Sequence, residues 1–332
     1  MSGALVPQAL ALAQAGQAAQ AVALLEAAFD DPAAQLLLGL WRIEGRNAPR
    51  DIARARTHFR SAADLGNAGG ARVLAGLIAS GSGGPADWRA ATTLLAQWAD
   101  RDPLAARQAD LIAAMDLDGV GNPATAAEPE LLSPMPYVAR LPGLLTPAEC
   151  QFLIDVSLPR FKPAEIFHEA QNRFRLDPVR QSDTAGFPLI SEWPLVHAIN
   201  RRIAAASATD VAQGETLQIL RYGPAQRYRP HLDAIPTLTN QRILTLIVYL
   251  NDDYTGGETR FIKSGLTVKG RNGDGLLFCN ALPDGRPDPA SEHEGCPISS
   301  GTKYLASRWI RAEPPEPGTS FGTHEASGDP AR

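Results

Sequence analysis

The sequence predicts an α+β protein with an N-terminal all-α helical-repeat domain, followed by a double-stranded β-helix (jelly roll) with supporting helices. Two observations predict this fold class. Residues 1–115 are rich in alanine and leucine and poor in β-branched residues, a composition that favours helix. Residues 215–311 instead contain eight short β-rich runs separated by turn signals. Eight short antiparallel strands that follow helices favour a double-sheet jelly roll.

Length, charge and cysteine usage narrow the class of protein further. The 332 residues are enough for about two domains. The net charge of −5 argues against nucleic acid as the main partner, because phosphate contacts need a basic surface. Three scattered cysteines suit a reducing compartment better than a disulfide framework. The N-terminal run lacks a basic segment and is interrupted by glutamines, so we expect no signal peptide, no membrane partner and a cytoplasmic location.

An internal repeat organises the N-terminal domain. The run "AQLLLGLWRIEGRNAPRD" from Ala34 aligns with "ARVLAGLIASGSGGPAD" from Ala71, an offset of 36 or 37 residues, and an amphipathic segment follows each copy. A third copy begins at Ala106 and then stops. This period is typical of stacked helical hairpins. The pattern resembles tetratricopeptide repeats of the Sel-like class, with an ordinary helical bundle as the alternative.

Composition also sets the boundaries of the remaining segments. Residues 116–135 are predicted to be a linker, since Gly, Asn and Pro interrupt them and large apolar residues are few. The jelly-roll domain is expected over residues 136–313. Residues 314–332 are polar and rich in Pro and Gly, so we expect them to form a disordered tail.

The second domain opens with helices and continues as strands. Thr146, Pro147 and Glu149 have the order of a helix N-terminus, which predicts a helix to about Val156. A second helix is expected near 190–206. The strand candidates are "ETLQILRYG", "QRYRPHLD", "RILTLIVYLN", "GETRFI", "LTVKG", "GLLFCNAL", "SEHEGC" and "TKYLASRWI".

A histidine and an aspartate stand two residues apart in the predicted strand "YRPHLDAI". Alternate residues of a strand point the same way, so His231 and Asp233 should converge on one point. His293, in the strand "SEHEGC", is the candidate third ligand of a metal. Two histidines and one carboxylate leave three open positions on an octahedral ion, as in the facial triad of non-haem Fe(II) oxygenases. A surface ion pair or a capped turn is the alternative for His231 and Asp233, and an ordinary core or surface histidine is the alternative for His293.

Lys303 follows His293 by ten residues, at the start of the last predicted strand. It shares a face with Leu305, Ser307 and Trp309, and an inward ammonium group needs an anion. Lysine is scarce in this chain, with four against 27 arginines, so its position is informative. The distal carboxylate of 2-oxoglutarate, a keto acid that chelates iron at its other end, is such an anion. A lysine at the sheet edge that reaches water is the alternative.

Residues 136–312 resemble the prolyl 4-hydroxylase branch (alpha-subunit catalytic-domain type) of the 2-oxoglutarate/Fe(II)-dependent dioxygenases. The resemblance rests on "LPGLLTPAEC", "ETLQILRYGPAQRYRPHLD", "RILTLIVYLNDDYTGGETRF" and the run from Gly275 to Arg311. It covers just over half the chain, and ligand spacing, the G-G-E-T turn and the final W-I-R occur together. Helical repeats before such a domain also look like a known bacterial arrangement.

The resemblance implies a role for each candidate residue. It implies that Fe(II) is the metal and that 2-oxoglutarate and O2 are cosubstrates, with ascorbate as a candidate reductant. The implied catalytic and metal-ligating residues are His231, Asp233 and His293. The implied cosubstrate residues are Lys303, Tyr222 and Thr245, and the candidate substrate-pocket residues are Tyr228, Arg180 and Trp309.

The implied reaction is hydroxylation of a prolyl residue in a peptide or protein, with release of succinate and CO2. The helical repeats could present that partner to the site. Residues 234–241 form a short segment for the family, which implies a reduced lid. Three alternatives remain: a free amino acid or small peptide as substrate, a repeat-based adaptor with an inactive oxygenase domain, and a zinc hydrolase that uses the same three ligands.

Overall fold

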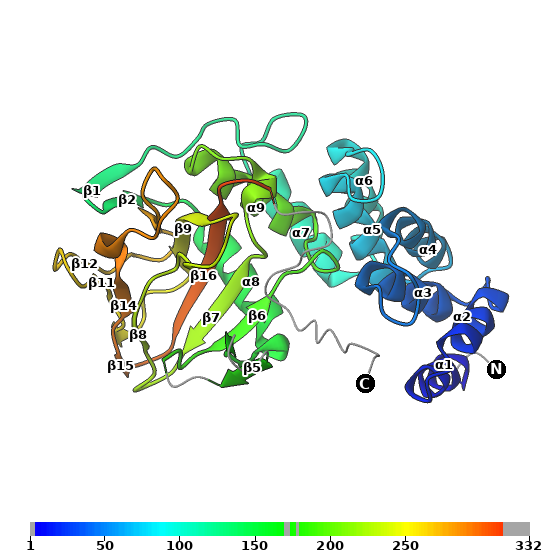
Figure 1. Ribbon diagram of the computed structural model, residues 1–332. Helices are drawn as coiled ribbons and strands as arrows, with labels where there is room; N and C mark the ends of the chain where they lie inside the picture. The colour runs from blue at the N-terminus through cyan, green and yellow to red at the C-terminus, as the bar shows by residue number, and fades with distance from the viewer. Residues whose placement is uncertain (1–3, 169–172, 177–178, 315–332) are drawn as a thin grey trace. The chain divides into compact units, whose positions relative to one another are not determined.

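The computed structural model describes residues 4–168, 173–176 and 179–314, and Figure 1 traces their elements. The chain divides into two compact units, Met1–Ala124 with Leu189–Ile199, and Thr125–Pro188 with Asn200–Arg332. Among the described residues, no helix has the length and apolar character needed to cross a membrane. The predicted tail lies outside the described residues except for its first residue.

The first unit is a row of helices in which neighbours along the chain pack against each other. The helices are α1 (Leu5–Gln14), α2 (Ala18–Ala27), α3 (Pro32–Glu44), α4 (Ile52–Asp64), α5 (Ala68–Ser80), α6 (Trp88–Trp98) and α7 (Pro103–Ala113). A further helix, α9 (Pro194–Ala206), begins in this unit and ends in the second.

The same capping chemistry recurs at the repeat spacing. Asp51 and Asp87, 36 residues apart, cap α4 and α6 by accepting backbone N–H groups of the first turn. Gly45 and Gly81, also 36 apart, end α3 and α5 in the left-handed conformation that glycine adopts without strain. Helix pairs α3–α4 and α5–α6 therefore occur where the sequence repeat predicts them. Their assignment to the tetratricopeptide or Sel-like class stays a prediction.

The second unit contains two sheets of a jelly roll. The large sheet has the order β1-β2-β13-β9-β16-β7-β6-β3, and the smaller one has the order β12-β11-β14-β8. The strands of the large sheet are β1 (Glu130–Pro134), β2 (Tyr137–Leu141), β3 (Lys162–Pro163), β6 (Asp183–Gly186), β7 (Gln218–Tyr222), β9 (Arg242–Tyr249), β13 (Gly275–Cys279) and β16 (Lys303–Arg311). Those of the smaller sheet are β8 (Tyr228–His231), β11 (Thr259–Phe261), β12 (Thr267–Val268) and β14 (His293–Gly295).

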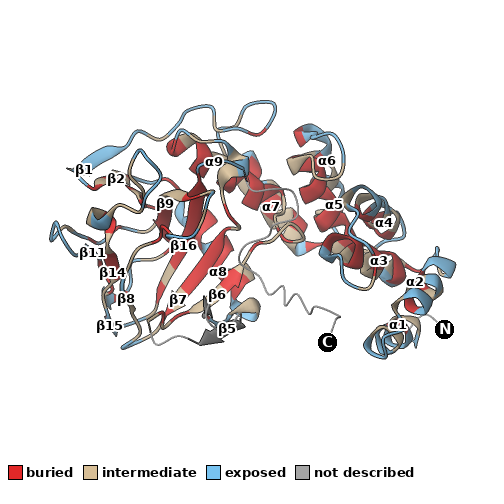
Figure 2. Ribbon diagram, viewed as in Figure 1, coloured by how far each residue is buried: buried red, intermediate tan, exposed pale blue. Residues whose placement is uncertain are grey.

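Two short pairs and one helix complete the unit. The pairs are β4 (Glu165–His168) with β5 (Arg173–Leu176), and β10 (Thr255–Gly256) with β15 (Ile298–Ser300). Helix α8 (Pro147–Ser157) begins at the predicted cap, where Thr146 and Glu149 form a reciprocal capping box. Figure 2 shows that buried residues concentrate on the central strands of the large sheet. The strands that carry the candidate site therefore contribute to the buried core of this unit.

The structure confirms the α+β class and all eight predicted strands, and it adds strands that the sequence did not suggest. The last part of the predicted linker 116–135 is not irregular chain, because Glu130–Pro134 form β1. This strand pairs with β2 at the edge of the large sheet. Its pairing partner, rather than its own composition, gives it a strand conformation.

Candidate active site

Strand register brings the two predicted histidine ligands together. β8 and β14 are antiparallel neighbours, and His231 lies directly opposite His293. Asp233 lies two residues beyond the end of β8. The Nε2 atom of His231 lies 3.5 Å from Asp233 Oδ1, and that of His293 lies 3.8 Å from Asp233 Oδ2. One ligand atom from each residue falls within a 4.8 Å cluster, as a single metal ion requires.

Backbone carbonyls hold both imidazoles in the form that binds a metal. His231 Nδ1 lies 2.8 Å from the carbonyl oxygen of Arg229, and His293 Nδ1 lies 2.9 Å from that of Ser291. Because a carbonyl oxygen only accepts, each Nδ1 carries a proton, which leaves Nε2 as the nitrogen that can bind a metal. Burial, together with nearby His231, lowers the pKa of His293 to about 4, so this imidazole is neutral at pH 7.

Aromatic rings enclose the two imidazoles. The ring of Tyr228 stacks on His231 with centroids 3.5 Å apart and planes 14° apart. Phe278 meets His293 edge-on at 4.7 Å, and Phe261 lies 5.7 Å from the same ring. These contacts restrict ring rotation, so the Nε2 atoms stay aimed at one point.

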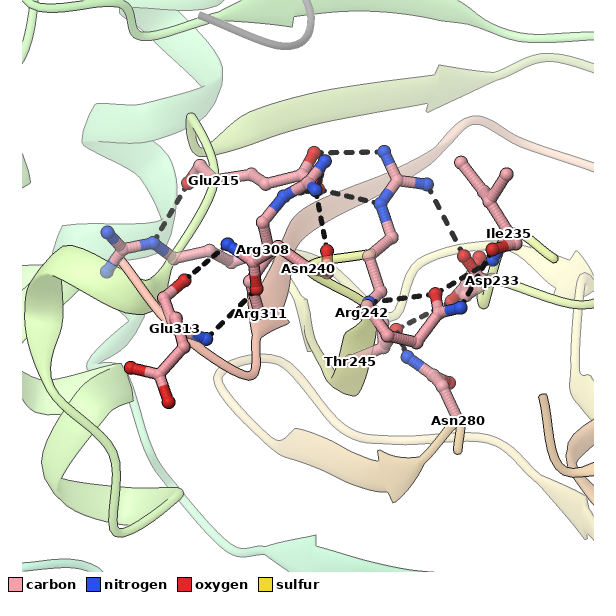
Figure 3. Close-up of polar contacts among 11 residues, drawn as sticks. Glu215, Asp233, Ile235, Asn240, Arg242, Thr245, Asn280, Arg308, Arg311 and Glu313 are labelled. Atoms are coloured by element: carbon pink, nitrogen blue, oxygen red, sulfur yellow. Dashed lines mark hydrogen bonds and ion pairs between the residues drawn. The ribbon is translucent and has the colours of Figure 1, made fainter. Parts of the chain in front are cut away.

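Asp233 stays ionised although it is buried. Burial alone would raise its pKa, but the nearby His231 and His293 rings and the hydroxyl of Thr245 hold the pKa well below its usual range. Thr245 Oγ1 lies 2.6 Å from Asp233 Oδ2, and Asn280 Nδ2 lies 2.7 Å from Thr245 Oγ1, as Figure 3 shows. The donor set of two imidazoles and one carboxylate fits a divalent iron ion.

Lys303 is buried in the pocket that the triad shares. Its side chain lines the pocket and the residue is only 2% exposed, so the inward direction predicted from strand periodicity is confirmed. The Nζ atom donates a 2.5 Å hydrogen bond to the carbonyl oxygen of Gly257 and lies 5.3 Å from the ring centre of Tyr249. Burial lowers the pKa of Lys303 to about 7. A carboxylate placed beside it would restore the charged form.

The remaining sequence-predicted residues line the same pocket: Tyr222, Thr245, Tyr228, Arg180 and Trp309. The guanidinium of Arg180 lies 5.5 Å from the ring centre of Tyr228 and 5.8 Å from that of Trp309. Tyr222 is opposite Lys303 in the β7–β16 pair, and burial raises its pKa. The structure therefore gathers all nine candidates around one pocket.

Sequence reasoning missed several polar residues of the site. Thr259, the last residue of the G-G-E-T run, lines the pocket, and its hydroxyl lies 3.2 Å from that of Tyr249. Cys296 also lines the pocket. The G-G-E-T motif was the available signal for Thr259, whereas nothing local distinguishes Cys296.

A buried ion-pair network supports the other side of Asp233, as Figure 3 shows. The carboxylate of Glu215 pairs with the guanidinium of Arg242 at 2.7 Å and with that of Arg311 at 2.8 Å. Arg242 reaches to 3.5 Å from the carbonyl oxygen of Asp233, and its guanidinium lies 4.0 Å from the ring centre of Trp309. Residues distant in sequence thus contact the segment that follows the candidate ligands His231 and Asp233.

Comparison with known proteins agrees with this geometry. Residues 217–311 match the model of the 2OG-Fe(II) oxygenase superfamily. Prolyl 4-hydroxylase 1 of Arabidopsis thaliana is 34% identical over 211 residues, which cover 58% of this chain and 73% of the relative. Prolyl 4-hydroxylase 13 of the same plant is 32% identical, with 54% and 73% covered.

Solved structures of prolyl hydroxylases are also similar to this chain. One is the viral collagen prolyl hydroxylase of Paramecium Bursaria Chlorella virus-1 in its 2OG complex, at 26% identity and a TM-score of 0.42, covering 53% of this chain and 96% of that one. Another is a Pseudomonas putida prolyl-4-hydroxylase, at 17% identity and a TM-score of 0.39, covering 52% and 91%.

The jelly roll, the two-histidine and one-carboxylate cluster and the superfamily match define an enzyme, a dioxygenase that depends on Fe(II) and 2-oxoglutarate. Fe(II), 2-oxoglutarate and O2 are the metal and cosubstrates of this class. The chain belongs to the prolyl 4-hydroxylase family.

Proposed function

We propose that this enzyme hydroxylates a prolyl residue of a peptide or protein in the pocket between its two sheets. The observation that carries the proposal is the clustering of His231, Asp233 and His293 in the pocket where Lys303 is buried. The prolyl 4-hydroxylases among the relatives support a prolyl substrate. When bound, iron and 2-oxoglutarate supply the oxidising chemistry, in which one oxygen atom of O2 enters the substrate and the other enters succinate.

The three triad residues would hold the iron in this proposal. Each imidazole would donate through Nε2, since its Nδ1 proton is used by a backbone carbonyl. Asp233 would add the one negative charge. Three protein ligands leave room for the keto acid and for O2 on an octahedral ion.

Lys303 would bind the distal carboxylate of 2-oxoglutarate, with Tyr222 beside it. Lys303 is buried, and a buried ammonium group needs a negative charge beside it. A charge-assisted hydrogen bond in such a dry site is worth more than one at the surface. This contact would orient the keto acid with its other end toward the triad.

The substrate would lie between Tyr228, Trp309 and Arg180. The two aromatic side chains offer flat apolar surfaces for a pyrrolidine ring, and the guanidinium beside them offers donors for a peptide carbonyl. Enclosure by these groups would also exclude water from the reacting carbon.

The helical unit would raise the local concentration of a protein substrate by binding it outside the pocket. This role predicts that a short peptide has a higher KM than the full protein substrate while kcat is similar. The cytoplasmic location expected from the sequence stays a prediction.

The decisive experiment measures succinate release and the gain of one oxygen by mass spectrometry. Proline-containing peptides, protein fractions and free proline are each incubated with the full chain, Fe(II), 2-oxoglutarate and O2. We expect peptide-dependent turnover that His231→Ala and Asp233→Ala both abolish. Asp284→Ala, which removes an exposed carboxylate, is the matched control and should keep full activity.

Each alternative gives a different result. Turnover of free proline without peptide turnover would replace the peptide substrate with an amino acid. Succinate release that persists in both triad variants would refute the assignment of the ligands. A wild-type chain that binds partners and never consumes 2-oxoglutarate would favour the adaptor.

A further inference from the structure

A chain of three buried polar side chains leads away from the metal-binding carboxylate. Asp233, Thr245 and Asn280 are 4%, 1% and 0% exposed. Thr245 lies on β9, and Asn280 directly follows β13, the neighbouring strand of the large sheet. The sequence gives no hint of this arrangement, because the three residues come from three separate segments.

Hydrogen-bond chemistry sets the direction of this chain. A carboxylate that ligates a metal ion can only accept hydrogen bonds, so the single hydroxyl proton of Thr245 is donated to Asp233 Oδ2 across 2.6 Å. Thr245 Oγ1 can then only accept from its other neighbour, the Asn280 amide at 2.7 Å. If the amide were turned round, two oxygen atoms would face each other with no proton between them. The Nδ2 group of Asn280 must therefore point at Thr245.

The fold itself does not require the side-chain amide of Asn280. Its backbone N–H donates to Ile243, and its carbonyl oxygen accepts from Asp288. The side-chain Oδ1 is buried and has no hydrogen-bond partner among the described residues. An unpaired buried amide oxygen is destabilising by about 1–3 kcal/mol, so a leucine of similar size would suit the fold at least as well. The amide is therefore explained by Thr245 and not by the fold.

We infer that Asn280 is a positioning residue which, through Thr245, makes Asp233 a ligand with one free oxygen. The Thr245 hydroxyl occupies Oδ2, and Oδ1 is left beside His231 Nε2. A carboxylate held in this way is disfavoured as a two-oxygen ligand, which keeps coordination positions open for the keto acid and O2. This inference rests on the proposed function of the triad.

The inference differs from the role that sequence suggested for Thr245. A cosubstrate contact would need the hydroxyl proton of Thr245, and in the structure Asp233 receives that proton. Loss of the hydroxyl should therefore change metal affinity first. The apparent 2-oxoglutarate requirement at saturating metal should change little.

The test is a double-mutant cycle on the full chain, with Co(II) alone as the probe and its Kd and visible absorption spectrum as readouts. Thr245→Val should raise the Co(II) Kd about 10- to 100-fold, and Asn280→Leu about tenfold. The double variant should bind no more weakly than Thr245→Val, since Asn280 acts through that hydroxyl. Thr245→Ser, which restores the hydroxyl, should return the Kd to within about threefold of wild type.

Controls separate the outcomes. Thr255→Val removes a hydroxyl that bonds Ser300 outside the pocket and should leave the Kd unchanged. Asn280→Ala replaces Asn280→Leu if the leucine does not fold. An unchanged Kd for Thr245→Val, or independent effects that multiply in the double variant, would overturn the inference while Asp233→Ala still weakens binding. If Asp233→Ala also binds Co(II) as wild type does, the proposed metal site itself fails and the inference fails with it.

Discussion

Replacing Lys303 by methionine tests the cosubstrate site most sharply. The substitution keeps a straight side chain that ends at Cε and removes the ammonium group of a residue that is 2% exposed and lines the pocket. A hydrogen bond to a charged group contributes about 1.5–3 kcal/mol. We therefore expect the half-saturating 2-oxoglutarate concentration to rise about 10- to 150-fold. Lys263→Met, which removes an exposed lysine, should leave it unchanged.

The pKa of Lys303 adds a second, independent signature. With a pKa of about 7, Lys303 is about 10% protonated at pH 8, and a bound carboxylate would restore the charged form. Binding of 2-oxoglutarate at pH 8 should therefore take up about 0.9 proton, falling to about 0.5 at pH 7. Calorimetric titration of the Co(II)-loaded protein in HEPES and in Tris, whose ionisation enthalpies differ, measures this uptake. Lys303→Met should show none of it.

Thermal stability distinguishes a lost contact from a damaged fold. The folded-state pKa of Lys303 lies below its unfolded value of 10.5, so the unfolded chain binds more protons between these values. The lysine therefore destabilises the free enzyme fully below pH 7, and less as the pH rises toward 10.5. At pH 8 without 2-oxoglutarate, Lys303→Met should raise the Tm. In the calorimetric titration, equal proton uptake by wild type and Lys303→Met would refute the placement of the 2-oxoglutarate carboxylate at Lys303.

Three further predictions concern the network, the pocket and the metal. Glu215→Ala leaves two buried guanidinium groups without their carboxylate. It should destabilise the protein by about 3–5 kcal/mol and lower the Tm by about 6–20 °C. Asp284→Ala, at an exposed ion pair, should change the Tm little. Trp309→Leu should raise the KM for a prolyl peptide about 5- to 30-fold, because an aromatic wall of the pocket is lost. Consumption of 2-oxoglutarate without peptide should stay similar. An unchanged KM would contradict the placement of Trp309 in the substrate pocket. A chelator should abolish turnover, and Fe(II) but not Zn(II) should restore it, because zinc has no redox chemistry; restoration by Zn(II) would favour the hydrolase.

Most of the candidate site could be predicted because its residues carry local signals. His231 and Asp233 are two apart in a stretch with a strand pattern, so the strand period predicts that their side chains point the same way, although β8 itself ends at His231. Lys303 begins the last strand, and the same period predicts that it shares a face with Leu305 and Ser307, although the strand is buried on both faces. The supporting residues lack such signals. Glu215 and Asn280 are ordinary polar residues in sequence, and their roles come from partners 27 and 35 residues away.

By itself, the sequence determined the helical and β-rich halves, the repeat spacing, the strands and the candidate ligands, because these depend on composition and on periods of a few residues. Only the tertiary structure decided that His231 lies opposite His293, that Glu130–Pro134 form an edge strand, and that Thr245 gives its proton to Asp233. Those features depend on which distant segments pair and in what register, and pairing is selected by burial and hydrogen bonding across the whole fold rather than by any one stretch of chain.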